Sequence, residues 1–85
     1  MDPFTTACDK AKTLASKLSD ADKLTLYSLF KQATAGDCTA PEPGFLDPVG
    51  RAKWAAWKER TGLPKGVAKK VYADVVKKVG QEESG

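Results

Sequence analysis

Aromatic side chains and lysines are interleaved at three places in this sequence. Tyr27 and Lys31 are four residues apart, so they share a face if this segment is helical. Lys53 directly precedes Trp54, and Tyr72 lies among valines and lysines. A phenol or an indole offers a π-face with a polar tip, and a lysine offers a mobile positive charge suited to phosphate. The combination indicates a ligand with a base, a phosphate and an apolar part, although these aromatic residues could instead fill a core.

The residue types that catalysis needs are scarce. The chain has no histidine, which excludes serine–histidine and cysteine–histidine nucleophiles and histidine-ligated zinc. Cys8 and Cys38 are too few for a zinc site, and we interpret them as free thiols in a reducing compartment, with one disulfide as the alternative. No carboxylates pair for acid–base work, and residues 44–51 lack the glycine spacing of a phosphate loop. We therefore expect no enzymatic activity, no metal and no cofactor.

Length and charge limit the protein further. The 85 residues have room for one domain with a small core, so we expect a single domain over residues 1–85. No apolar run approaches the roughly 20 residues of a membrane span, and no secretory signal is evident, so we expect a cytoplasmic protein. The net charge is +3, but residues 48–79 carry nine basic and two acidic residues, a local charge of +7. An anionic partner would explain this excess, and so would a solvated lysine-rich helix face.

Four helices are expected to position these residues. Asp2-Pro3 has the residue types of an N-cap and a first helical position, and Ser19 predicts the start of a second helix that Gly36 ends. A third helix is expected over about residues 51–60, and a fourth begins near Pro64. Apolar residues recur at helical spacing in the first helix (Phe4, Ala7, Cys8, Ala11, Leu14, Ala15 and Leu18) and in the fourth (Ala68, Tyr72, Val75, Val76 and Val79).

Proline and glycine recur in residues 36–50, which predicts a loop of about 15 residues, long for a small helical protein. We interpret Pro41-Glu42-Pro43 within it as a rigid connector rather than a ligand for a proline-reading module. A connection of this length favours a crossover between two neighbouring helices over a tight hairpin. No segment alternates with a period of two, so the predicted fold class is all-α.

Three segments carry a more specific pattern: Tyr27-Ser28-Leu29-Phe30-Lys31-Gln32-Ala33-Thr34-Ala35-Gly36-Asp37, Lys53-Trp54-Ala55-Ala56-Trp57 and Ala68-Lys69-Lys70-Val71-Tyr72. In this order and at these intervals they resemble the acyl-CoA-binding protein family, and the resemblance extends from Phe4 to Val79. It implies a four-helix bundle with up-down-down-up topology and a long overhand crossover between the second and third helices. It also implies high-affinity binding of long-chain fatty acyl-CoA thioesters, without catalysis, by an intracellular carrier and pool former.

The resemblance further implies which residues bind the ligand: Lys12, Leu24, Tyr27, Ser28, Leu29, Phe30, Lys31, Lys53 and Tyr72. In the family the adenine and the 3′-phosphate lie on the residues that correspond to Tyr27 and Lys31, with help from Lys53. The position of Lys12 approaches the head group, that of Leu24 lines the ligand, and the CoA head covers the acyl chain in its groove. The partners implied are acyl-CoA and at most a transient membrane contact, for a monomer that binds no nucleic acid.

The sequence departs from the family at three places. Phe30 stands where the family usually has a tyrosine, so one hydroxyl near the phosphate is missing. Cys8 replaces a small residue near the adenine, which concerns affinity or ligand preference. Gly66 and Val67 replace acidic residues at the start of the fourth helix, where carboxylates would be stabilising.

Two other classes of function compete with this interpretation. A small basic helical nucleic-acid-binding module would use the basic second half, but no helix combines arginine with asparagine at a base-reading spacing. A peripheral membrane or scaffold module would need a helix with a large exposed apolar face, whereas the apolar stripes here match one another in a four-helix core.

Overall fold

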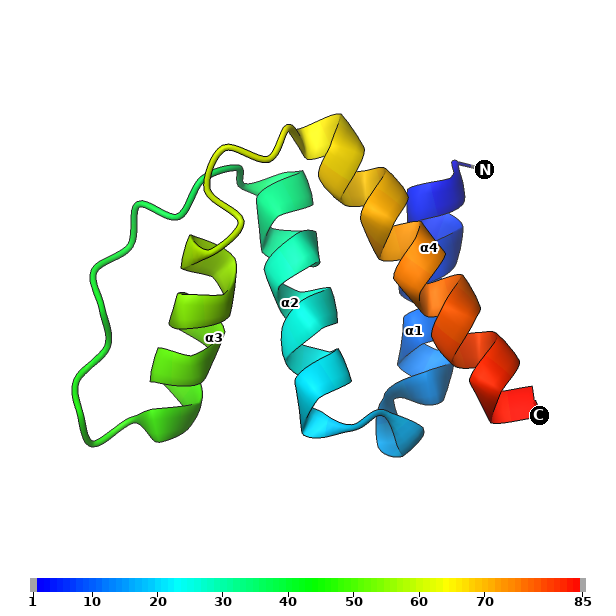
Figure 1. Cartoon of the computed structure of the whole chain (residues 1–85), viewed down its shortest axis with the longest axis horizontal. Coiled ribbons are helices and arrows are strands. Elements are labelled where there is room, and N and C mark those ends of the chain that lie inside the picture. The colour runs from blue at the N-terminus through cyan, green and yellow to red at the C-terminus, as the bar shows by residue number, and fades with distance from the viewer. Residues whose placement is uncertain (1, 85) are drawn as a thin grey trace.

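The computed structural model describes residues 2–84, with side chains described for residues 2–81. Its helices are α1 (Pro3–Leu14), α2 (Asp20–Thr34), α3 (Pro48–Lys58) and α4 (Lys65–Ser84), and a short 3₁₀ turn (Ala15–Lys17) follows α1. The described part of the chain contains no strand, so the predicted all-α class is confirmed. Figure 1 shows α2 and α3 running in one direction and α1 and α4 in the other, which confirms the up-down-down-up topology with a long crossover between α2 and α3.

The core lies where α4 packs on α2 and α1. α2 is central, because it contacts α3 on one side and α4 on the other, while α1 packs mainly against α4 (Figure 1). The predicted stripes of α1 and α4 face this core, with Ala7, Leu14, Ala68, Tyr72 and Val76 buried. Ala15 is the exception: it is exposed, because the α-helix gives way there to the tighter 3₁₀ turn.

The ends of α1 and α2 form as the residue types predict. The Asp2 carboxylate accepts a hydrogen bond from the backbone N–H of Phe4 at 2.8 Å, and the Ser19 hydroxyl accepts one from Asp22 at 3.1 Å. Gly36 has a φ of 86°, a left-handed conformation that glycine adopts without strain, and it ends α2. These ends fix α2 as one uninterrupted helix through the motif that carries the aromatic and lysine side chains.

The third helix begins earlier than predicted. It starts at Pro48 instead of residue 51 and ends at Lys58 instead of residue 60. The Asp47 carboxylate caps it by accepting from the N–H of Gly50 at 3.0 Å, and proline suits the first position because no N–H is needed there. A Cβ on Gly50 would collide with this carboxylate, so the glycine that suggested a loop in fact permits the cap.

The two thiols are free, as predicted: Cys38 is buried and Cys8 is half-buried.

Candidate functional site

Two lysine–aromatic pairs bridge α2 and α3 in opposite senses. The ammonium of Lys53, on α3, lies 5.4 Å from the ring centre of Tyr27 on α2. The ammonium of Lys31, on α2, lies 5.0 Å from the ring centre of Trp57 on α3. Each is a cation–π contact, worth about 0.5–1 kcal/mol at an exposed site. We call these four residues the α2–α3 clasp; it unites three of the predicted binding residues and adds Trp57.

The two indoles are anchored at their nitrogen atoms. Trp57 Nε1 donates to the carbonyl of Gly36 at 2.8 Å, and Trp54 Nε1 donates to the carbonyl of Ala40 at 2.8 Å. A third cation–π contact places the Lys58 ammonium 5.7 Å from the Trp54 ring. The tryptophans thus tie α3 to the crossover, and Trp57 holds the lysine that the sequence assigned to phosphate. The sequence motif contained Trp57, but its spacing gave no sign of this pairing across helices.

A hollow of about 330 Å³ opens beside Tyr27 between α1, α2 and α4, and we call it the α1–α2–α4 hollow. It is mostly apolar. Its lining includes four predicted binding residues together with neighbours from α1, α2 and the turn that joins them: Lys12, Tyr27, Phe30 and Tyr72, with Cys8, Ala11, Ala15, Leu18, Lys23 and Leu26. The structure therefore gathers residues as far apart in the sequence as Cys8 and Tyr72 onto one surface.

Three aromatic rings from three helices underlie this hollow. Phe4 stacks on Phe30 with ring centres 6.0 Å apart and meets Tyr72 edge-on at 5.2 Å. Tyr72 is buried, and burial, with the Cys8 thiol beside it, raises the pKa of its hydroxyl to about 12. The phenol therefore stays protonated at neutral pH. Phe30 is 40% exposed, so part of its ring is open to a ligand.

A second hollow, of about 360 Å³, lies between the first turns of α2 and α3, and we call it the α2–α3 hollow. Two predicted binding residues, Leu24 and Lys53, line it with Asp20, Lys23, Pro48, Val49 and Ala52. Lys23 lines both hollows, so they lie on either side of the same stretch of α2. The surface as a whole offers apolar walls, one open tyrosine and several lysines.

Two predicted binding residues do not reach this surface. Ser28 and Leu29 are completely buried. The Ser28 hydroxyl donates to the carbonyl of Thr25 at 2.8 Å and accepts from Arg60 Nε at 3.0 Å, and Leu29 belongs to the core. In this structure both side chains support α2 from within, and contact between these residues and the ligand stays a prediction.

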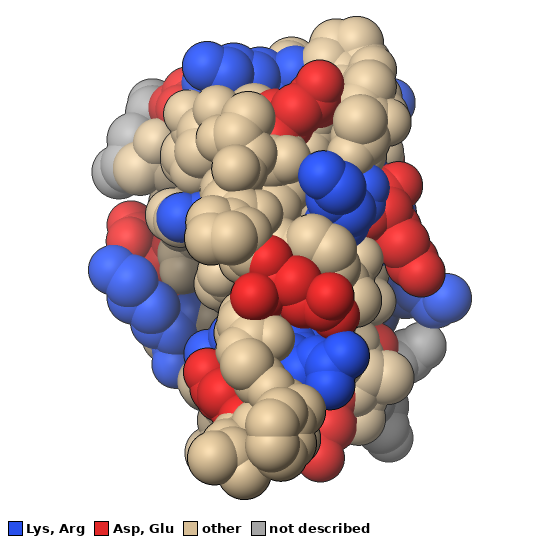
Figure 2. All heavy atoms as spheres, turned by 90° about the vertical axis from the view of Figure 1, so that its left-hand side faces the viewer, with Lys and Arg blue, Asp and Glu red and all other residues tan. Residues whose placement is uncertain are grey.

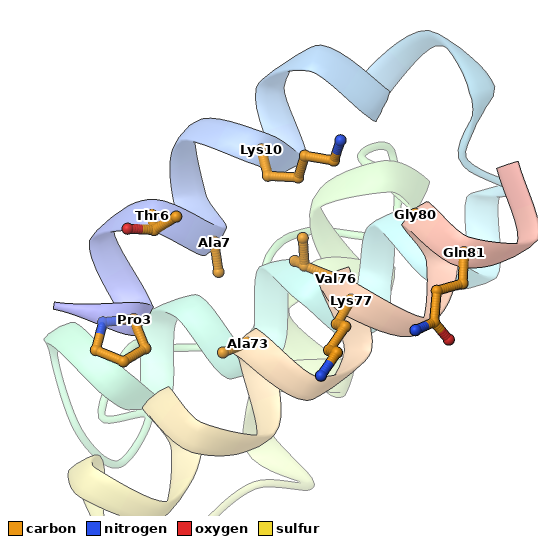
Figure 3. A pocket seen from close by; sticks show the side chains of 9 residues that line it. All are labelled: Pro3, Thr6, Ala7, Lys10, Ala73, Val76, Lys77, Gly80 and Gln81. Carbon is orange, nitrogen blue, oxygen red and sulfur yellow. The ribbon is translucent and has the colours of Figure 1, made fainter. Parts of the chain in front are cut away.

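A further hollow lies elsewhere, away from the predicted binding residues. It measures about 500 Å³ and runs between α1 and α4, where Figure 3 shows Ala7 and Val76 pointing into the space between the two helices. Lys10 and Lys77 also line it, but no aromatic residue and none of the predicted binding residues does. Its residue types do not match a ligand with a base.

Charges of both signs are interspersed around the site. Figure 2 looks onto α3 and the crossover, where acidic groups separate the lysines and arginines. Arg51 pairs with Glu42 at 2.9 Å, and Lys12 with Asp9 at 4.0 Å. Within the described residues, no helix has the length and apolarity to cross a bilayer, and no three acidic or thiol side chains cluster to hold a metal ion.

Comparison with known proteins places this chain in a family. The family model described as "Acyl CoA binding protein" matches residues 1–76. Acyl-CoA-binding protein homolog 1 of Caenorhabditis elegans is 45% identical over 76 residues, which cover 89% of this chain and 88% of that protein. Enoyl-CoA delta isomerase 2 of Rattus norvegicus is 45% identical over 73 residues, but the match covers 86% of this chain and only 19% of that larger protein.

Comparison of the fold with solved structures points to the same family. The crystal structure of Oryza sativa acyl-CoA-binding protein 2 superposes with a TM-score of 0.92 at 43% identity, and the match covers 96% of this chain and 91% of that one. The resemblance seen in the three sequence segments is thereby confirmed, and the chain belongs to the acyl-CoA-binding protein family.

Proposed function

We propose that this chain is one non-catalytic domain that binds long-chain fatty acyl-CoA thioesters with high affinity. In this proposal it is a monomer, and it carries and stores these esters in the cytoplasm. Family membership supports acyl-CoA as the ligand class. The observation that carries the proposal for this chain is the α2–α3 clasp, which holds two lysines and a tyrosine between two apolar hollows.

The clasp suits the head of such a ligand. The open face of Tyr27 can stack on an adenine. The ammonium groups of Lys31 and Lys53 lie beside the rings of the clasp, within reach of the phosphates of a ligand that is bound at these rings. A charge-assisted hydrogen bond to phosphate contributes about 1.5–3 kcal/mol. The head group would therefore set orientation and selectivity, and free fatty acid, which lacks phosphates, should bind far more weakly.

The hollows suit the acyl part. Each methylene removed from water contributes up to about 0.8 kcal/mol, so even a shallow apolar groove supplies much of the affinity for a long chain. Leu24, Val49 and Ala52 give the α2–α3 hollow such a surface. Neither contribution needs a general base, a metal or a cofactor. Specific nucleic-acid binding, the alternative, finds no support in the comparisons, and acids interrupt the basic residues in Figure 2.

Calorimetric titration of the purified protein tests the proposal. We expect one long-chain acyl-CoA per chain, an affinity that rises with acyl length, and much weaker binding of both free CoA and free fatty acid. Equal affinity for fatty acid and acyl-CoA would refute it. Binding to DNA or RNA with a steep salt dependence, and no response to acyl length, would instead favour the alternative. Sedimentation equilibrium checks the monomer, and cell fractionation checks the cytoplasmic location.

A further inference from the structure

The crossover presents three large apolar side chains to solvent. Phe45, Leu46 and Val49 are 79%, 85% and 63% exposed, more than any other large apolar side chain in the described part of the chain. They lie within five consecutive residues. Single exposed apolar residues are normal on a protein surface, but a contiguous group of this kind marks an interaction site.

This exposure is built into the fold. Phe45 and Leu46 are the two central residues of a turn closed by a hydrogen bond of 3.0 Å from the N–H of Asp47 to the carbonyl of Gly44. Asp47 then caps α3, so the turn continues directly into the helix. Before this turn, the ion pair of Arg51 with Glu42 and the hydrogen bond from Trp54 to Ala40 fasten the crossover to α3. The two side chains are therefore held at the end of the molecule.

The turn adjoins the α2–α3 hollow. Val49 belongs both to the exposed group and to the lining of that hollow, and Pro48 between them lines it as well. Figure 1 shows the turn of the crossover at the same end of the molecule as the first turns of α2 and α3. In Figure 2 the lower end of this face is an uncharged projection. The exposed group therefore adjoins the apolar lining of the hollow at Val49.

A lipid surface fits this group better than a protein does. A stable protein interface buries about 800 Å² on each partner, and three side chains fall well short of that. The interface of a bilayer, in contrast, accepts a small apolar projection, with lysines at the depth of the phosphates. Lys23 and Lys53 line the hollow directly behind Val49, with Asp20 as the one acid among its lining residues.

We propose that the turn of Phe45 and Leu46, together with Val49, docks into the surface of a phospholipid bilayer. An acyl chain then passes between the bilayer and the α2–α3 hollow without crossing open water. The docking surface stands on the exposed residues alone, whereas the transfer step rests on the proposed function. The proposed occupant of the surface is phospholipid, and a second copy of the chain is the competing outcome of the test.

The double variant Phe45→Ser/Leu46→Ser tests the proposal, and Val67→Ser is its matched control, since Val67 is an exposed valine at the start of α4. Vesicles of phosphatidylcholine, with and without phosphatidylserine, are the probe, and binding is measured by flotation. We expect the double variant to bind vesicles about tenfold or more weakly than the wild type, and the control to bind as the wild type does. The swap Phe45→Leu/Leu46→Phe should restore binding, because apolar character and not residue identity carries the docking. Melting temperatures should be unchanged, because these side chains are exposed.

Two further measurements separate the possible failures. Extraction of acyl-CoA from vesicles, followed by tryptophan fluorescence, should slow in the double variant, while its affinity for acyl-CoA in vesicle-free solution stays as in the wild type. Vesicle binding that is unchanged in the double variant overturns the proposal, and so does a wild-type dimer that the double variant abolishes without any loss of vesicle binding. If the wild type fails to bind acyl-CoA in solution, the proposed function fails, while flotation still decides the docking surface.

Discussion

Replacement of Lys31 by methionine isolates the charge that the clasp holds. Methionine keeps most of the length and the apolar stem but removes the ammonium. That ammonium lies 5.0 Å from the centre of the Trp57 ring, a contact worth about 0.5–1 kcal/mol. A charge-assisted hydrogen bond to phosphate is worth about 1.5–3 kcal/mol. If the ammonium leaves the ring to reach the phosphate, the net contribution to binding is about 0.5–2.5 kcal/mol, so Lys31→Met should weaken acyl-CoA binding roughly 2- to 70-fold.

The 3′-phosphate should account for most of this loss. Calorimetry with acyl-CoA and with its 3′-dephospho analogue measures it, and the variant and the wild type should differ little for the analogue. Lys58→Met is the matched control, because Lys58 makes a similar contact with Trp54 at 5.7 Å but lies outside the α2–α3 clasp. Each variant should lower the melting temperature by about 2–8 °C, as expected for the loss of 0.5–1 kcal/mol in a small domain. An equal loss of affinity for both ligands would refute the reasoning, and so would an equal loss in the control.

Two further predictions concern the aromatic rings under the α1–α2–α4 hollow. Phe30 is 40% exposed, so the hydroxyl of Phe30→Tyr can stay in contact with solvent or ligand. We expect calorimetry to show that this variant binds acyl-CoA more tightly by about 0.5–1.5 kcal/mol and binds the dephospho analogue no more tightly. A drop in melting temperature without tighter binding would show that the ring serves the core. Burial raises the pKa of Tyr72 from 10.0 to about 12, so the unfolded chain releases this proton first and the free energy of unfolding should fall as the pH rises from 10 to 12. Chemical denaturation across this pH range should show a smaller fall for Tyr72→Phe. An identical fall would contradict the raised pKa of Tyr72.

Helical periodicity in the sequence predicts much of the fold and part of the site. The caps at Asp2 and Ser19 and the stop at Gly36 are local signals, so the sequence predicts them without knowledge of the tertiary structure. The same period explains why two predicted binding residues are buried. Positions 28 and 29 lie about 100° and 200° around the helix from Tyr27, so the adjacency of Ser28 and Leu29 in the motif gave no reason to place them on its face.

Other features depend on packing between helices that no local pattern contains. Pairing of Lys53 with Tyr27 requires α3 to lie beside α2 in parallel, and the stacking of Phe4 on Phe30 requires the start of α1 to lie near α2. The start of α3 was predicted too late because proline and glycine usually interrupt helices. At Pro48 and Gly50 both residues instead serve the cap.

The way in which α3 is attached determines how the protein opens locally. This helix buries no residue fully, and its main helical neighbour is α2. Detaching α3 therefore exposes less apolar surface than opening the α1–α2–α4 core does, so α3 should open at a lower free energy than that core. A ligand held by Tyr27 on one side and Lys53 on the other would have to be released before α3 could swing away. The hydrogen-exchange rate of the α3 amides then becomes a direct gauge of ligand occupancy, and the lifetime of the bound state is coupled to the lifetime of one weakly anchored helix.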